Sequence, residues 1–324
     1  MGVLQSQSFC ELLGGVITSW HASSLREPAD LQPIENLTRL TSLTLMDGTN
    51  LGSMSELPCL QCLDCVTLWG YSGLATKVEN FAYLQSLFLS EGQDEICNLS
   101  SCSNLTDLSL GCMGDVVKQV LLPEGNHVML CYLSIGECQE PKFDFVMENL
   151  SAATKLREVQ FLDAYPSNFA SGGWPISLPH LTMVRLTGLH GDLPAQLASY
   201  PALREFVLTR YQQSSLPAWL SCMTQLTSLT ISYGKLTHFP RDILQLSQLR
   251  QLIMPNSPTF SLTRDMLCLA HWPALPLVRI NTATESDEDS ADEDLEFCLE
   301  SQLLLLELKG TLKSYKPHCN LFWY

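Results

Sequence analysis

A phrase of apolar residues recurs along most of the chain at intervals of roughly 21 to 28 residues. One copy reads LTSLTISYGKLTHFP, in which Leu229 and Ile231 alternate with polar residues as in a short strand. A strand this short cannot bury its apolar side alone, whereas stacked copies can. The residues equivalent to Leu229, called anchors below, are Leu43, Val66 (or Leu63), Leu87, Leu108, Leu133, Val159, Val184, Phe206, Leu229, Leu252, Val278 and Leu306. The sequence therefore predicts a solenoid of about twelve repeats.

From residue 37 to residue 310 the pattern resembles the leucine-rich repeat family. Leu189–Pro194 is similar to the L-x-G-x-I-P phrase of plant-type repeats, and Leu216–Leu220 to the L-P-x-x-L phrase of another repeat type. The resemblance implies an α/β horseshoe with a parallel sheet on its concave side and loops and short helices on its convex side. The family usually has Asn or Cys three residues after the second apolar residue of the strand. This sequence matches that rule at Cys138 and departs from it at Gly234, Tyr211, Leu189 and Ala164.

The chain is expected to have four segments. Residues 1–36 contain a short amphipathic pattern and are predicted to form an N-terminal helical cap. Residues 37–280 hold the repeats, and residues 298–324 hold the last repeat and a C-terminal cap. Between them, residues 281–297 are predicted to be an acidic disordered loop, because ESDEDSADEDLE has eight acidic residues and no basic one. Ser286 and Ser290 each precede an acid by three residues and are candidate phosphorylation sites.

Composition limits the class of partner and the compartment. The net charge is −16, from 34 acidic and 18 basic residues, which disfavours binding to nucleic acid or to an anionic membrane. No secretory signal is recognisable, and no apolar run reaches the ~18 residues of a membrane span. Thirteen cysteines are scattered without a disulfide framework. We therefore expect a cytoplasmic protein with reduced thiols. An axonemal or cytoskeletal location is the alternative, by resemblance to some algal leucine-rich repeat proteins.

Two short motifs suggest chemistry that the repeat also explains. The first six residues match the myristoylation pattern at Gly2, although a structural cap accounts for this segment as well. Cys59, Cys62 and Cys65 have the spacing of metal ligands, but a site needs a fourth ligand. Apolar residues run at the same interval of three through this stretch, so the cysteines also fit as small core residues. We predict no metal and no cofactor.

The concave face is the candidate binding surface. Its outward positions include Trp69, Phe88 and Tyr132 in the first half of the chain. In the second half basic residues appear, namely Arg157, Arg185, Arg204, Arg250 and Arg279. No catalytic motif is recognisable. We therefore predict a non-catalytic scaffold or adaptor that binds a protein, with an acidic patch on that partner facing the arginines. The alternatives are a regulatory subunit, such as a ubiquitin-ligase substrate receptor, and a cilium-associated repeat protein.

Overall fold

The computed structural model forms two compact units, residues 1–181 and 182–324. It describes residues 16–23, 39–46, 63–70, 83–90, 96–111, 119–123, 129–136, 146–148, 152–162, 178–188, 193, 195–238, 240–254, 277–280, 310 and 320–323. Each unit is a β-solenoid, and each is described by itself below.

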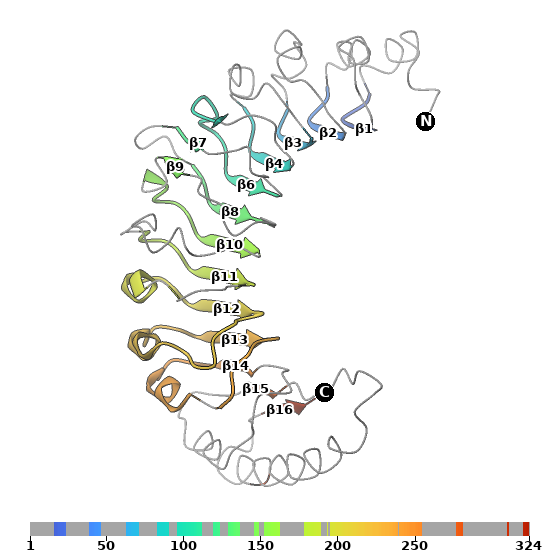
Figure 1. The fold of residues 1–324 in the computed structure, drawn as a ribbon. Coiled ribbons are helices and arrows are strands. Elements are labelled where there is room, and N and C mark those ends of the chain that lie inside the picture. Colours follow the sequence, from blue (N-terminus) through green and yellow to red (C-terminus); the bar gives the residue numbers. More distant parts are fainter. Residues whose placement is uncertain are drawn as a thin grey trace. The chain divides into compact units, whose positions relative to one another are not determined.

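The first unit is built on a parallel sheet in which every strand pairs with the next one along the solenoid (Figure 1). Its strands are β1 (Ser19–Ser23), β2 (Ser42–Met46), β3 (Cys65–Trp69), β4 (Ser86–Ser90), β6 (Asp107–Leu110), β8 (Tyr132–Ile135) and β10 (Glu158–Leu162). The anchors Leu43, Val66, Leu87, Leu108, Leu133 and Val159 are in register. A small second parallel sheet joins β5 (Ile96–Asn98), β7 (Gln119–Leu121) and β9 (Val146–Glu148).

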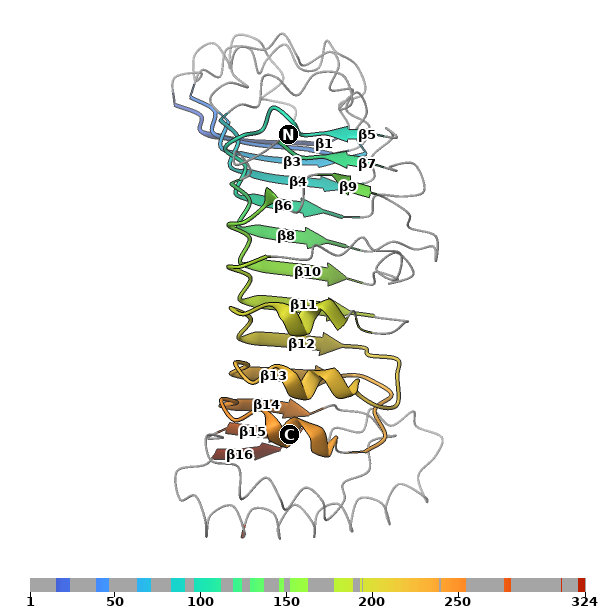
Figure 2. The same ribbon diagram turned by 90° about the vertical axis from the view of Figure 1, so that its left-hand side faces the viewer.

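The second unit repeats the same plan with helical turns on the other side of the solenoid (Figure 2). Its parallel strands are β11 (Met183–Thr187), β12 (Glu205–Thr209), β13 (Ser228–Ser232), β14 (Gln251–Met254), β15 (Leu277–Ile280) and β16 (Asn320–Trp323). The 3₁₀ turns are η9 (Ala195–Ser199), η10 (Ala218–Cys222) and η11 (Arg241–Gln245).

These helical turns follow from the L-P-x-x-L phrase. Pro217 and Pro240 stand just before η10 and η11, where a residue without an N–H leaves no donor unsatisfied. Each turn then buries one apolar side chain, Leu220 in η10 and Ile243 in η11. A single buried side chain per turn is enough to hold each short helix against the sheet.

The core lies between the sheet and the returning chain, and it explains the short strands. In β13 the burial alternates, so Leu229 and Ile231 point inward and are 0% exposed. Burying one such side chain stabilises the fold by about 1.5–3 kcal/mol. Because each anchor packs on those of neighbouring repeats, the core extends along the solenoid instead of forming a centre.

Successive repeats are joined before each strand by the backbone. The carbonyl oxygen of Thr41 accepts the N–H groups of Asp64 and Cys65, at 2.8 and 3.0 Å. The same arrangement recurs in the second unit, where the carbonyl oxygen of Arg204 accepts the N–H groups of Thr227 and Ser228, at 2.8 and 3.0 Å. Because only main-chain atoms are required, residues as different as Thr41 and Arg204 serve at this position.

The backbone also joins the repeats just after the strand. The fourth residue after the anchor has a positive φ at Gly70, Gly188, Arg210 and Tyr233. This conformation directs the N–H of Arg210 to the carbonyl oxygen of Ser232 on the next strand, at 2.8 Å. Arg210 and Tyr233 adopt this left-handed conformation although it is unfavourable for residues other than glycine.

At the place of the family's Asn or Cys, Tyr211 is buried and its hydroxyl donates to the carbonyl oxygen of Ser215, at 3.2 Å. The carbonyl oxygen of Tyr211 accepts the N–H of Lys235, at 2.8 Å. In this repeat a main-chain bond between turns and a tyrosine bond within the loop replace the expected side-chain ladder.

The leucine-rich repeat solenoid is confirmed, with small differences in the repeats. A strand, β1, lies inside the predicted cap, and Leu321 instead of Leu306 stands opposite Val278. Val66 is the second anchor, and Leu63 is a separate core residue. Within the described residues the main strands number seven in the first unit and six in the second, against about twelve predicted repeats. The predicted helix of the cap, the acidic loop with Ser286 and Ser290, Gly2, Cys59 and Cys62 fall outside the described residues.

Within the residues that the structure describes, no helix has the length and apolar character needed to cross a membrane. Within the same residues, no group of three or more His, Cys, Asp or Glu side chains is placed to hold a metal ion.

Candidate functional site: the sheet face

We call the solvent-facing side of the main sheet in each unit the sheet face. It carries the residues one before, one after and three after each anchor, since alternate side chains of a strand point to opposite sides. In the first unit the position before the anchor holds Ser19, Ser42, Cys65, Ser86, Asp107, Tyr132 and Glu158. The position after it holds His21, Thr44, Thr67, Phe88, Ser109, Ser134 and Gln160.

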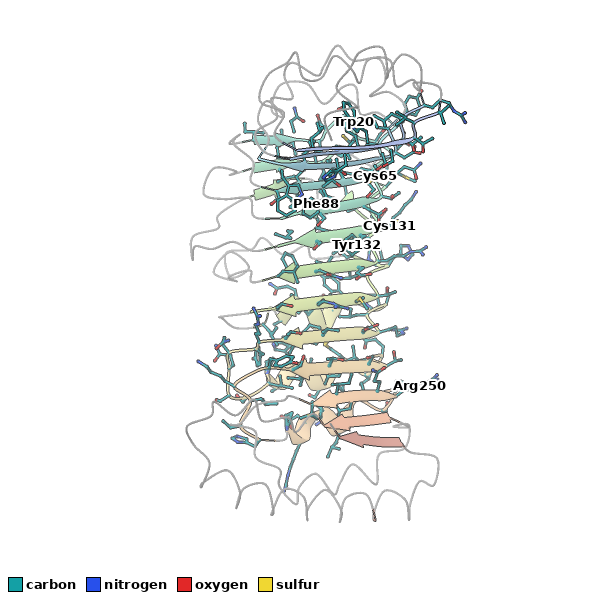
Figure 3. All side chains as sticks on the ribbon, turned by 90° about the vertical axis from the view of Figure 1, so that its right-hand side faces the viewer. Trp20, Cys65, Phe88, Cys131, Tyr132 and Arg250 are labelled. Atoms are coloured by element: carbon teal, nitrogen blue, oxygen red, sulfur yellow. The ribbon has the colours of Figure 1, made fainter. Side chains whose placement is uncertain are left out.

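Two aromatic side chains meet on the sheet face of the first unit. Trp69, at the end of β3, and Phe88, on β4, have ring centroids 5.5 Å apart and planes inclined by 31°. Trp69 is 37% exposed and Phe88 is half-buried. Figure 3 shows Phe88 on this face together with Tyr132 of β8. The three predicted aromatic residues therefore share one face, and two of them are in contact.

Small residues lie on the side of the aromatic pair that faces β6. Gly111 follows β6 beside Phe88, and a Cβ built on it would lie 3.3 Å from Phe88 Cζ. Gly136 occupies the same place after β8. Ser90 and Ser134 are only 2% and 5% exposed although they belong to the solvent-facing side of their strands. On this side the Phe88 ring therefore meets a residue without a side chain of its own.

The sheet face of the first unit carries acids at two outward positions. None of its described outward positions in the seven strands is Lys or Arg, and His21 of β1 is the histidine among them. Asp107 is exposed, and its Oδ2 accepts the hydroxyl of Thr106 at 2.6 Å. Glu158 Oε1 accepts the amide of Gln160 at 2.7 Å. These hydrogen bonds orient two carboxylates on this face.

The sheet face of the second unit is basic at the position after the anchor. That position holds Arg185, Val207, Thr230, Ile253, Arg279 and Phe322 from β11 to β16. The Nε of Arg185 is buried and forms no hydrogen bond to any described residue. Arg279 is placed by the register of β15, opposite Ile253 of β14.

The other predicted arginines do not lie within the strands. Arg157, Arg204 and Arg250 each occupy the exposed position just before a strand, where the carbonyl ladder runs. The Nη1 of Arg204 donates to the carbonyl oxygens of Pro201 and Leu203, at 3.1 and 3.3 Å. These three residues therefore lie at the amino-terminal ends of the strands instead of on the sheet face. Arg157 belongs to the first unit and the other two to the second.

Sequence reasoning missed the small residues and the acid beside the aromatic pair. Gly111 and Gly136 end two similar phrases, DLSLG and YLSIG, so a repeated glycine three residues after the anchor was a visible signal. Asp107 stands at an outward position that is filled by serine in three of the earlier strands. Their value could not be recognised without the register, which brings Gly111 beside the Phe88 ring and places Asp107 on the neighbouring strand, opposite Ser86.

The described cysteines are free thiols in different surroundings. Cys97 and Cys102 are buried, Cys65 and Cys131 are half-buried, and Cys222 is exposed. Burial raises the pKa of the Cys102 thiol to about 12, opposed by a hydrogen bond with Ser101. A buried thiol of this kind is a packing residue and not a nucleophile.

No protein-family model matches the chain, and no curated protein sequence does. Among solved structures, an internalin from Listeria monocytogenes is 17% identical to this chain. The match covers 92% of this chain and 83% of the internalin, with a TM-score of 0.51. A leucine-rich repeat protein of Leptospira interrogans is 15% identical, covers 98% of both chains and has a TM-score of 0.32.

The functional domain of the Listeria monocytogenes protein InlJ, which includes a cysteine ladder, is 14% identical to this chain. The match covers 84% of this chain and 61% of InlJ, with a TM-score of 0.42. Identities this low bear on the fold alone. The sequence repeat, the parallel ladder of short strands and the likeness to the internalin show that this chain folds as a leucine-rich repeat solenoid.

Proposed function

We propose that the chain is a non-catalytic protein-interaction module, a scaffold or adaptor that binds a partner on the sheet face. The observation that carries this is the pair formed by Trp69 and Phe88, which leaves aromatic surface exposed on a face without Lys or Arg. The cores of protein interfaces are enriched in aromatic residues and depleted of charge, and Trp and Tyr dominate their hot spots. Solenoids use such extended sheets as binding surfaces.

A second contact is proposed for the second unit. Arg185 and Arg279 occupy the same position on β11 and β15, with uncharged residues at that position on the strands between them. An acidic patch on the partner would pair with them, and the orphaned Nε of Arg185 supports a carboxylate as its ligand. Arg204 and Arg250, at the amino-terminal ends of β12 and β14, would add weaker, solvent-exposed ion pairs.

The test is comparative affinity capture from native extract with quantitative mass spectrometry. The bait variant combines Trp69→Ser with Phe88→Ser, and the control is Tyr83→Ser, an exposed aromatic residue in the turn before β4. We expect a set of proteins to be lost with the double variant and retained with the control, while circular dichroism shows both folded. Retention of the whole set by the double variant and by Arg185→Glu would refute binding through the sheet face. Ligase subunits or axonemal proteins in the lost set would identify the adaptor's pathway.

A further inference from the structure

We infer that the sheet face of the first unit recognises an extended basic segment of a partner protein, with one cationic side chain on the Trp69–Phe88 pair and a second at Asp107. This deepens the proposed function and rests on it. The segment would carry arginines four residues apart.

The aromatic pair presents a surface suited to a cation. With centroids at 5.5 Å and planes inclined by 31°, the rings are tilted toward a stack and not edge-to-face. Trp69 remains 37% exposed, so aromatic surface is open to the partner. A guanidinium over such a face is attracted by the negative π cloud, and Trp is the strongest partner for it. Arginine fits better than lysine because its planar group also stacks.

The rings are held in place by their surroundings. Phe88 Cζ lies 3.3 Å from the position that a Cβ on Gly111 would take, so the ring lies close against the glycine backbone. Ser90, which follows Phe88 on the same side of β4, is almost fully buried. A ring packed in this way is already in position before the partner arrives, which lowers the entropy lost on binding.

Asp107 and the aromatic pair lie toward opposite ends of the strands. β4 and β6 pair with Phe88 opposite Ser109, so Asp107 is one strand over and two residues back. The Phe88 ring leans the other way, to Gly111, which follows β6 four residues after Asp107. At a rise of about 3.3 Å per residue, four residues separate the two contacts by roughly 13 Å. Residues four apart in an extended peptide span the same distance.

Charge favours a basic occupant over the alternatives. The described outward positions of the first unit include Asp107 and Glu158 and no Lys or Arg. The chain as a whole carries a net charge of −16, which attracts basic segments at long range. An acidic segment would meet like charge here, and an apolar one would offer no opposite charge to either carboxylate.

The inference can be tested with short fluorescent peptides and the full chain. The probe is Ser-Gly-Ser-Arg-Ser-Gly-Ser-Arg-Ser-Gly-Ser, and its comparison replaces both arginines with citrulline, which keeps the shape and removes the charge. Fluorescence anisotropy gives the Kd for the wild type, Trp69→Leu, Phe88→Leu and Asp107→Asn. Tyr83→Leu and Asp242→Asn are matched controls, since both residues are exposed and lie outside the sheet face.

We expect the arginine peptide to bind more tightly than the citrulline peptide and to weaken as salt rises. Trp69→Leu should weaken it about 3- to 30-fold, the range of a cation–π contact. Asp107→Asn should weaken it up to about 5-fold, as for an exposed ion pair. Both controls should leave the Kd unchanged.

Two results would overturn the inference. Equal binding of the citrulline peptide would show that the positive charge is not recognised. An unchanged Kd in Trp69→Leu and Phe88→Leu would show that the aromatic pair is not the binding site. Neither result refutes the wider function if the double serine variant still loses its partners from extract. Conversely, if the capture set survives every sheet-face variant, the proposed function itself fails.

Discussion

Gly111 lies so close to Ser90 that a Cβ on residue 111 would stand 2.9 Å from Ser90 Oγ and 3.0 Å from Ser90 Cβ. The same Cβ would lie 3.3 Å from the ring of Phe88. Ser90 is almost fully buried and has little room to move. The absence of a side chain at residue 111 therefore leaves room for both Ser90 and the Phe88 ring.

Gly111→Ala should destabilise the fold by about 1–3 kcal/mol, as expected for overpacking. The matched control is Gly136→Ala, for which the nearest atoms lie at 3.7 Å and no clash arises. That change should be neutral or stabilising by up to about 1 kcal/mol, because alanine restricts the unfolded chain. Urea unfolding monitored by circular dichroism measures both. Equal effects of the two substitutions would show that residue 111 is not tightly packed.

Leu229→Ala should destabilise the second unit by about 2–5 kcal/mol, because it empties a fully buried position in β13. Solenoid repeats contact mainly their neighbours, so hydrogen exchange should accelerate most in β12, β13 and β14. Thr230→Ala, on the opposite side of the same strand, should change stability by less than about 0.5 kcal/mol. Unchanged protection in these three strands would contradict the role of Leu229 as an anchor.

Tyr233→Gly should stabilise the second unit by up to about 1 kcal/mol, because it relieves a non-glycine residue with φ of 50°. Gly188→Ala is the reverse change at the equivalent position, where φ is 70°, and should cost about 1–2 kcal/mol. Thermal unfolding of both variants decides the matter. A lower Tm for Tyr233→Gly would mean that packing of the tyrosine ring outweighs the backbone strain.

The cysteines should separate by reactivity in the folded protein. Cys222 is exposed and should be alkylated by iodoacetamide at pH 8, whereas Cys102 should stay unmodified because burial holds its pKa near 12. Above pH 9 the unfolded chain ionises this thiol while the folded chain does not, so the free energy of unfolding should fall as pH rises from 9 toward 12. Peptide mass spectrometry measures the labelling. Equal labelling of the two cysteines at pH 8 would contradict the burial of Cys102.

Much of the fold could be predicted because the repeat is carried by apolar spacing. Anchors such as Val66 and Leu229 recur at one position of the phrase, and the structure places them in register. The prediction was wrong at the last repeat, where the chain between β15 and β16 is longer than one period and Leu321 takes the position assigned to Leu306. Where two candidate apolar residues lie more than one period after the last anchor, spacing alone cannot rank them.

The candidate site was less predictable because it depends on pairs of strands. Trp69 and Phe88 could be assigned to one face from their positions, but their contact requires the register between β3 and β4. The sequence predicts all five arginines on one face. In the structure Arg204 lies before its strand, whereas Arg185 lies within one. An offset of one residue moves a side chain to the opposite side of a strand, and residues before the strand, such as Arg204, do not follow its alternation.

The bonds between repeats at the start of each strand come from carbonyl oxygens, such as those of Thr41 and Arg204, and need no particular side chain. A repeat can therefore be duplicated or lost as a block, provided that the new neighbours bring their strands to the same starting point. Diversity can then accumulate on the outward positions without loosening the scaffold. Such a molecule can change its binding specificity without changing the interactions that stabilise its fold.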